Sequence, residues 1–270
     1  MKVLISDNLP DICKTILESA DIQVTTKTDF APEELQKEIG AYDGLIIRSS
    51  TQCTPEIIEK ADKLQAICRA GVGVDNVNVP AATKKGVIVM NTPGGNTTST
   101  AEHAITLLLA LSRNIPHACN SVREGKWERK KFTGTQVSGK VLGVIGLGKI
   151  GKEVAKRAVA LEMRVLGYDP FVSNETIPKL NVQLVENLEE IYRQADYITL
   201  HIPLTNDTKH LISSSELELM KDGVRIINCA RGGIISEDSL YDAIVSGKVG
   251  GSFSKTSIAA PATLPLTMAS

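Results

Sequence analysis

The sequence predicts an α/β protein of two domains, each a parallel sheet wound on both faces by helices. Two observations carry this prediction. Short β-branched runs alternate with helix-like stretches from Lys2 to about Val89, and a second series of the same kind starts at Lys140. Such alternation is typical of parallel sheets, because parallel neighbours need a crossover connection. A chain of 270 residues is long enough for two domains of ordinary size.

The first series defines a domain over residues 1–98. Its predicted strands are Val3–Ser6, Gly44–Ile47, Gln65–Cys68 and Val87–Val89, with a helix at Pro32–Ile39. Glycine and proline in residues 92–96 then interrupt the pattern. Ser99 or Thr100 is a suitable helix start before the apolar residues 104–111, so we place the domain boundary before residue 99.

The second series defines a domain over residues 99–251. Its predicted strands are Val141–Ile145, Arg164–Tyr168, Tyr197–Leu200 and Arg225–Asn228, with a helix at Ile150–Leu161. Before them, residues 121–133 are polar and basic around Trp127. This composition favours an exposed arm, with a solvated loop as the alternative. Residues 252–270 are small and interrupted by proline, which predicts an irregular tail.

Composition excludes several classes of function. A hydrophobic content of 42% with 23% charged residues is typical of soluble globular proteins, and a net charge of −1 favours neither nucleic acid nor membrane as partner. No apolar run approaches the roughly 18 residues of a membrane span, and the polar amino terminus does not resemble a signal peptide, so we expect a cytoplasmic protein. The five cysteines lack C-x-x-C spacing, which predicts buried thiols and no metal site.

The segment 146–151 has the pattern G-x-G-x-x-G between a predicted strand and a predicted helix. In this setting Gly146 permits the tight turn, Gly148 lets the backbone approach a pyrophosphate, and Gly151 lets helix and strand pack closely. The helix amino terminus then offers unpaired N–H groups to the phosphates. The pattern therefore predicts a dinucleotide-binding site.

Asp169 ends the next strand, eighteen residues beyond Gly151. A carboxylate at this place accepts hydrogen bonds from the hydroxyls of the adenine ribose. It also repels a 2′-phosphate, so the sequence predicts NAD rather than NADP as cofactor.

Over residues 1 to about 251 the chain resembles the D-2-hydroxyacid dehydrogenases, oxidoreductases that use NAD. The segments that carry the resemblance are Arg69–Val77, Val89–Pro93, Gly125–Phe132, the glycine loop and Ile227–Gly233. The segment around Trp127 looks particularly like members that oxidise 3-phospho-D-glycerate to 3-phosphohydroxypyruvate in serine biosynthesis. The resemblance implies a flavodoxin-like substrate domain followed by a Rossmann NAD-binding domain.

The resemblance also implies roles for residues of the second domain. It makes Arg231 the catalytic arginine, which binds the substrate carboxylate and polarises the reacting carbonyl. A guanidinium suits this task because its planar fork grips a carboxylate and stays cationic. The residues that it assigns to the cofactor are Gly146, Gly148, Lys149, Ile150, Gly151, Asp169, His201, Cys229, Ala230 and Arg231. For His201, a packed structural histidine is the alternative.

Further roles fall on the first domain and the arm. In the Gly71–Val74 turn the resemblance assigns Val72 to the cofactor and the amides of Gly73 and Val74 to the substrate carboxylate. The positions of Arg48 and Arg69 resemble residues near the substrate phosphate, although a surface ion pair would have the same sequence. Arg129 resembles an arginine that reaches a neighbouring subunit, in a homodimer formed through the helix near Ser99.

The sequence departs from the family in its last segment. The family's proton relay pairs a histidine with a glutamate after the matched region, whereas no acidic residue or histidine follows Asp242 here. Loss of a positioned acid or base typically costs about 10² to 10⁴ in rate. Two alternatives to 3-phospho-D-glycerate oxidation therefore stay open: a catalytically weak protein that binds NAD or dimerises, and a dehydrogenase of another D-2-hydroxy acid.

Overall fold

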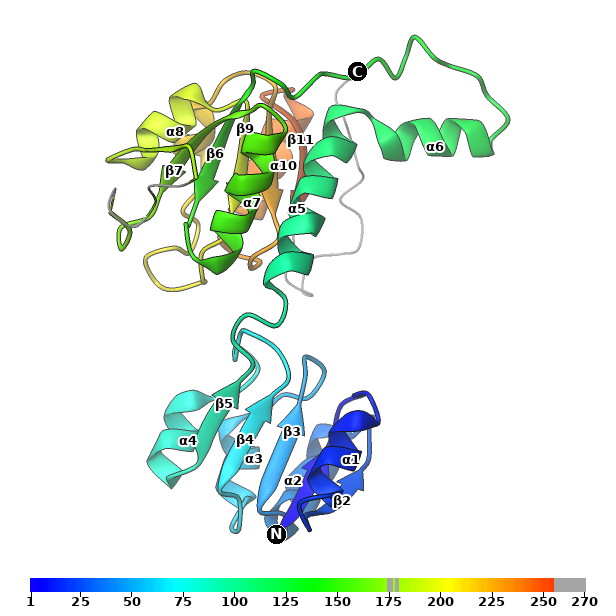
Figure 1. Cartoon of the computed structure of the whole chain (residues 1–270), viewed down its shortest axis with the longest axis vertical. Coiled ribbons are helices and arrows are strands. Elements are labelled where there is room, and N and C mark those ends of the chain that lie inside the picture. Colours follow the sequence, from blue (N-terminus) through cyan, green and yellow to red (C-terminus); the bar gives the residue numbers. More distant parts are fainter. Residues whose placement is uncertain (174–176, 178–179, 255–270) are drawn as a thin grey trace. The chain divides into compact units, whose positions relative to one another are not determined.

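The computed structural model describes residues 1–173, 177 and 180–254, which divide into two compact units (Figure 1). The units are Met1–Asn96 and Thr97–Ser270. The division falls two residues before the predicted domain boundary, because the helix predicted to begin at Ser99 or Thr100 begins at Thr97.

Unit 1 contains a five-stranded parallel sheet in the order β2-β1-β3-β4-β5. Its strands are β1 (Lys2–Ile5), β2 (Gln23–Thr26), β3 (Gly44–Ile47), β4 (Ala66–Arg69) and β5 (Ile88–Asn91). Its helices are α1 (Ile12–Glu18), α2 (Pro32–Glu38), the 3-10 helix Ile39–Ala41, α3 (Pro55–Lys60) and α4 (Val79–Lys85). This strand order is that of flavodoxin-like sheets, so the predicted fold of the first unit is confirmed.

The two faces of the first sheet are covered unequally. Helices α2, α3 and α4 share one core with inward residues of the strands, including Leu4, Leu45 and Ile67. Helix α1 lies on the other face (Figure 1). Within this unit, that second face leaves Ile88 and Met90 of β5 exposed by 63% and 46%.

Unit 2 contains a six-stranded parallel sheet in the order β11-β10-β9-β6-β7-β8. Its strands are β6 (Val141–Ile145), β7 (Arg164–Tyr168), β8 (Val182–Leu184), β9 (Tyr197–Leu200), β10 (Val224–Asn228) and β11 (Val249–Ser254). Its helices are α5 (Thr97–Ser112), α6 (Ile115–Arg123), α7 (Lys149–Ala160), α8 (Leu188–Gln194), α9 (Ser214–Leu219) and α10 (Glu237–Val245). Counted within the unit, this is the 3-2-1-4-5-6 order of a Rossmann sheet read from the other edge, which confirms the prediction.

Helix α5 belongs to the core of its own unit. Ala104, Leu108 and Leu111 are buried in one cluster with residues of α7 and β6. The helix through which the resemblance implies a homodimer therefore packs its apolar stretch mainly inside its own unit, and that stretch does not by itself indicate a dimer.

Helix α6 and the segment after it extend away from the sheet of their own unit (Figure 1). Trp127 in this segment has 78% of its surface exposed, as an arm would have. Cys119 on α6 is also exposed, so the prediction of a buried thiol is wrong there. It holds for Cys53, whose pKa burial raises to about 12. The remaining cysteines, Cys13, Cys68 and Cys229, are half-buried.

The predicted irregular tail begins too early. Strand β11 runs to Ser254 and pairs with β10, with Ser252 opposite Ile226 and Ser254 opposite Asn228. Residues 252–254 thus complete the second sheet, and residues 255–270 lie outside the described part of the chain. Within the described ranges, no helix is long and apolar enough to cross a membrane, and no group of three or more metal-ligating side chains is found.

Candidate cofactor and substrate sites

Two glycines of the motif are required by the backbone around them. Gly146 follows the fully buried strand β6 with a φ of +93°, and a Cβ there would lie 2.6 Å from the carbonyl oxygen of His201. A Cβ on Gly151, in the first turn of α7, would lie 1.9 Å from the carbonyl oxygen of Gly146. Only glycine fits at either position, because both contacts are with backbone atoms.

Gly148 differs from the other two. It is the N-cap of α7 with a φ of −66°, and a Cβ built there meets no atom within 4 Å. The absent side chain therefore leaves open space in front of the helix amino terminus, where Lys149 and Ile150 form the first turn. Helix amino termini attract phosphate through their unpaired N–H groups and the helix dipole. The loop thus fits the pyrophosphate of a dinucleotide.

The carboxylate of Asp169 lies beside this loop. One oxygen accepts a hydrogen bond from the N–H of Leu147 at 2.8 Å, and the other accepts one from the N–H of Phe171 at 2.9 Å. Each carboxylate oxygen has a second acceptor site. The side chain is half-buried, so it is fixed at the end of β7 and can still accept from ribose hydroxyls. Its assignment to the ribose stays a prediction.

The loop after β10 is organised by a residue that sequence reasoning missed. The side chain of the buried Asn228 donates to the carbonyl of Arg231 at 2.7 Å and accepts from the N–H of Ala230 at 3.0 Å. The guanidinium of Arg231 donates to the carbonyl of Ala230 at 2.9 Å. Asn228 therefore fixes the shape of the loop that carries Cys229, Ala230 and Arg231. Its place at the end of a strand was the available signal.

His201 follows β9 and is half-buried. Its Nε2 shares a 2.9 Å hydrogen bond with the hydroxyl of Thr199, and burial lowers the pKa of the imidazole to about 4. At neutral pH the ring is therefore uncharged and has no spare proton to give. This state suits a packed structural histidine, and its contact with the cofactor stays a prediction.

In the first unit, Asp7 organises the loop that carries Arg48. This buried carboxylate, just beyond β1, accepts hydrogen bonds from the N–H groups of Arg48 and Thr51 and from the Thr51 hydroxyl. The amide of Asn76 donates to the carbonyls of Arg48 and Thr51 at 2.8 and 2.6 Å. Arg48 itself stays exposed. Sequence reasoning missed Asp7 and the role of Asn76.

The turn after β4 carries the remaining residues of this edge. Arg69 donates through Nε to the carbonyl of Arg48 at 3.2 Å, and its guanidinium lies against Gly71, where a Cβ would overlap it. The side chain of Asn91 donates to the carbonyl of Val72 at 2.6 Å. Among the described residues, no acceptor is recorded for the N–H groups of Gly73 and Val74. These two amides are therefore available to an anion.

The structure brings the predicted residues together in two sets. Those of unit 2 follow the carboxyl ends of β6, β7, β9 and β10 and so lie at the same end of that sheet. Open α/β sheets usually bind their ligands at the carboxyl ends of the strands. The carboxyl ends of the strands in unit 1 carry Arg48, Arg69 and residues 72–74. Arg129 belongs to neither set, because it is exposed in the segment after α6.

Comparison with curated proteins gives close relatives. The chain is 50% identical over 249 residues to the D-3-phosphoglycerate dehydrogenase of Archaeoglobus fulgidus and 49% identical over 250 residues to that of Sus scrofa. These alignments cover 92% and 93% of this chain and 47% of each relative. The chain thus spans about half the length of the curated relatives that it matches.

Solved structures show the same architecture. A protein of Thermus thermophilus superposes with a TM-score of 0.88 at 32% identity, covering 98% of this chain and 84% of that one. The NAD-dependent formate dehydrogenase of Staphylococcus aureus, solved with NAD, gives 0.85 at 30% identity with the same coverage.

A family model decides the classification. Residues 105–254, more than half of the chain, match the NAD-binding domain of the D-isomer specific 2-hydroxyacid dehydrogenases. This span contains the glycine loop, Asp169 and the loop held by Asn228, so the predicted NAD-binding domain is confirmed. The chain therefore belongs to the D-isomer specific 2-hydroxyacid dehydrogenase family.

Proposed function

We propose that the protein is an NAD-dependent dehydrogenase that oxidises 3-phospho-D-glycerate to 3-phosphohydroxypyruvate, a reaction of serine biosynthesis. The proposal rests on the carboxyl ends of the strands in unit 2. There the open amino terminus of α7, the carboxylate of Asp169 and the Arg231 loop held by Asn228 lie at the same end of the sheet. The relatives at about half identity bear the name of this activity. The place of action that we propose is the cytoplasm, where NAD and phosphorylated carbon metabolites are found.

Residues of unit 2 would hold the cofactor. The pyrophosphate would lie on the amides at the start of α7, over the space that Gly148 leaves open. Asp169 would accept from both hydroxyls of the adenine ribose and exclude a 2′-phosphate by repulsion. When bound, NAD accepts the hydride that leaves the substrate carbon.

Arg231 would bind the substrate carboxylate and polarise the carbonyl that forms. Asn228 supports this role, because its two hydrogen bonds to the loop fix the backbone from which the guanidinium extends. A positioned cation is worth on the order of 3 kcal/mol of transition-state stabilisation. Lysine at this place would keep the positive charge but could not form the bidentate hydrogen bonds of a guanidinium with a carboxylate.

The phosphate of the substrate would be bound by Arg48 and Arg69, and its carboxylate by the amides of Gly73 and Val74. Asp7 and Asn76 form hydrogen bonds with the backbone of Arg48, which fixes the loop from which its side chain extends and so supports this assignment. This assignment favours a phosphorylated substrate over other D-2-hydroxy acids.

The hydroxyl proton must leave as the hydride departs, and we propose that water accepts it. His201 cannot supply a proton for the reverse reaction at pH 7, because burial keeps its pKa near 4. We therefore assign it no role as general acid.

The test is oxidation of NADH by purified protein with 3-phosphohydroxypyruvate, compared with hydroxypyruvate, which lacks the phosphate. We expect a higher kcat/KM for the phosphorylated substrate. Arg231→Lys should lower kcat/KM about 10²-fold, and Arg48→Ala with Arg69→Ala should raise KM for the phosphorylated substrate alone. Equal kcat/KM values for the two substrates would contradict the assignment of Arg48 and Arg69 to the phosphate. Absence of turnover by protein that binds NADH would contradict the proposed activity.

We also propose that the protein is a homodimer in which Arg129 reaches the neighbouring subunit. Support comes from exposed apolar side chains on α6 and in the segment after it: Ile115, Val122 and Trp127 are exposed by 49%, 58% and 78%. Exposed apolar side chains on neighbouring segments are typical of an interaction surface. Light scattering should give a dimer mass, and Val122→Asp should shift it toward the monomer. A monomer mass for the unaltered protein would overturn the proposal.

A further inference from the structure

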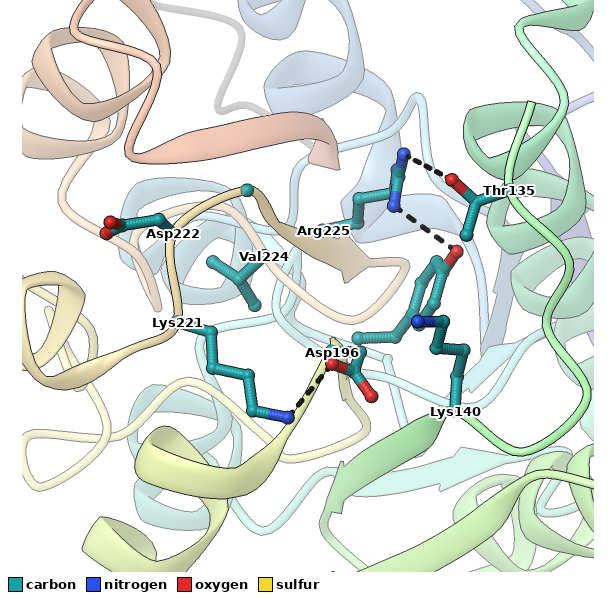
Figure 2. Close-up of a pocket in the computed structure, with 9 residues that line it drawn as sticks. Thr135, Lys140, Asp196, Lys221, Asp222, Val224 and Arg225 are labelled. Atoms are coloured by element: carbon teal, nitrogen blue, oxygen red, sulfur yellow. Dashed lines mark hydrogen bonds and ion pairs between the residues drawn. The ribbon is translucent and has the colours of Figure 1, made fainter. Parts of the chain in front are cut away.

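Unit 2 contains a cavity at the amino ends of its strands, opposite the carboxyl ends where we place the cofactor. It has a volume of about 210 Å³ and is lined by Thr135, Lys140, Asp196, Tyr197 and residues 221–225 (Figure 2). Lys140, Asp196 and Val224 stand at the amino ends of β6, β9 and β10. The glycine loop follows the other end of β6, roughly 16 Å away at about 3.3 Å per residue. The cavity is therefore distinct from the proposed cofactor site.

Arg225 lies in this cavity without an adequate acceptor. Its Nε is buried and has no hydrogen-bond partner among the described residues. Its two terminal nitrogens donate to the hydroxyls of Tyr197 and Thr135 at 3.3 and 3.4 Å, which are long contacts to neutral oxygens. The ring of Tyr197, 5.5 Å from the guanidinium carbon, adds some stabilisation. No carboxylate of the described chain forms an ion pair with Arg225.

The carboxylates near the cavity are already compensated. Asp196 accepts from the ammonium of Lys221 at 2.9 Å and from the N–H of Val141 at 2.8 Å. Asp222 pairs with Lys248 at 2.8 Å and is directed away from Arg225 (Figure 2).

Lys140 is half-buried at the cavity wall and forms no ion pair with a carboxylate of the described residues. Arg225 and Lys140 are thus two cations of the cavity that form no ion pair with a carboxylate of the described residues, because Asp196 pairs with Lys221 and Asp222 with Lys248 outside the cavity. A buried or partly buried cation is costly unless an anion or strong acceptor pairs with it.

We propose that this cavity binds a phosphate group, either as inorganic phosphate or as the phosphate of a small phosphomonoester. The guanidinium fork of Arg225 matches the oxygens of a phosphate, and the Thr135 hydroxyl and the Lys140 ammonium supply further donors. A phosphate dianion compensates the charges of both Arg225 and Lys140, whereas a carboxylate compensates one.

Calorimetric titration of the protein with inorganic phosphate and, in parallel, with glycerol 2-phosphate tests the proposal. Saturating NADH keeps phosphate away from the glycine loop. Arg225→Met should weaken binding about tenfold or more, since it removes charge-assisted hydrogen bonds. Lys140→Met should weaken it as well, and this variant keeps the test valid where Arg225→Met unfolds the protein, because Lys140 is only half-buried. The probe that binds more tightly identifies free phosphate or an ester as the ligand.

Arg164→Met is the matched control. Arg164 is the first residue of β7, so it lies at the same end of the sheet as the cavity but does not line it. Its guanidinium donates to the side-chain oxygen of Gln194 at 3.0 Å. We expect its phosphate affinity to stay within about twofold of the unaltered protein. Absence of phosphate binding, or binding that both cavity variants leave unchanged, would overturn the proposal.

Discussion

The two glycines Gly148 and Gly151 lie three residues apart, and the structure predicts that replacing Gly151 by alanine lowers stability whereas replacing Gly148 by alanine weakens cofactor binding. A Cβ at Gly151 would lie 1.9 Å from the carbonyl oxygen of Gly146, so the helix and the turn must separate. Overpacking of this kind costs about 1 to 3 kcal/mol, and a contact of 1.9 Å with a backbone atom corresponds to the upper end. Alanine gains roughly 1 kcal/mol over glycine in a helix, so the net loss of stability is about 2 kcal/mol. At about 2 to 4 °C per kcal/mol for a unit of this size, Tm should fall by about 4 to 8 °C.

Gly148→Ala should leave stability nearly unchanged. Its φ of −66° suits any residue, and its Cβ meets no atom within 4 Å. The loss of glycine at the N-cap costs at most about 1 kcal/mol, which the lower entropy of the unfolded alanine chain offsets in part. The added methyl group occupies the space in front of the helix, where we place the pyrophosphate. A clash of about 1 to 3 kcal/mol there weakens NAD binding about 5- to 150-fold.

Thermal unfolding without cofactor and fluorescence titration with NADH, applied to both variants, measure the two effects separately. Gly151→Ala should lower Tm, and Gly148→Ala should raise the Kd at a Tm close to that of the unaltered protein. An unchanged Kd for Gly148→Ala would refute the placement of the pyrophosphate. An unchanged Tm for Gly151→Ala would refute the packing argument.

Three further predictions concern the same sheet. Asp169→Ala should weaken NADH binding about tenfold or more and reduce the preference over NADPH in titrations, whereas Asp169→Asn should keep the hydrogen bond from Leu147 and lose the discrimination. His201 has a folded pKa of about 4, below its ordinary 6.5. The unfolded chain therefore binds the extra proton, and the free energy of unfolding should fall by up to about 3 kcal/mol as the pH drops from 6.5 to 4. His201→Gln should flatten that slope in urea titrations, and an equal slope would exclude this source. Asn228→Ala should destabilise unit 2 by about 1 to 3 kcal/mol and speed amide exchange in residues 229–231, because two backbone groups lose their partner.

The sequence was sufficient for the elements whose signal is local. Strand β6 is five apolar residues, all buried, and the glycine pattern directly after it fixes the turn and the start of α7 within one residue of the prediction. The alternation of strands and helices was sufficient for two parallel sheets, and the family resemblance, rather than the alternation, implied their strand orders.

Edge strands were harder to predict. Strand β2 is half-buried and polar, and β8 has three residues, so neither has the apolar run of a central strand. Strand β11 contains small residues that are typical of an irregular tail. It forms because the edge of β10 offers a ladder of backbone hydrogen bonds, which side-chain composition does not reveal.

The candidate site was predicted at the residues that face ligands and missed at those that hold the loops. Asp7 and Asn228 act through hydrogen bonds to backbone groups of neighbouring loops, and such bonds depend on the distances that the fold creates. Their common position at the carboxyl end of a strand was a usable signal. Arg225 had no such signal, because its sequence position indicates only a polar residue at the start of a strand.

Hydrogen exchange with and without NAD tests the central claim most directly. If the cofactor binds at the carboxyl ends of the strands of the second sheet, NAD should slow amide exchange in residues 147–151 and 229–231. The amides of residues 221–225 at the opposite end should exchange at an unchanged rate. Protection confined to other segments, or no protection of the glycine loop at saturating NAD, would contradict the account.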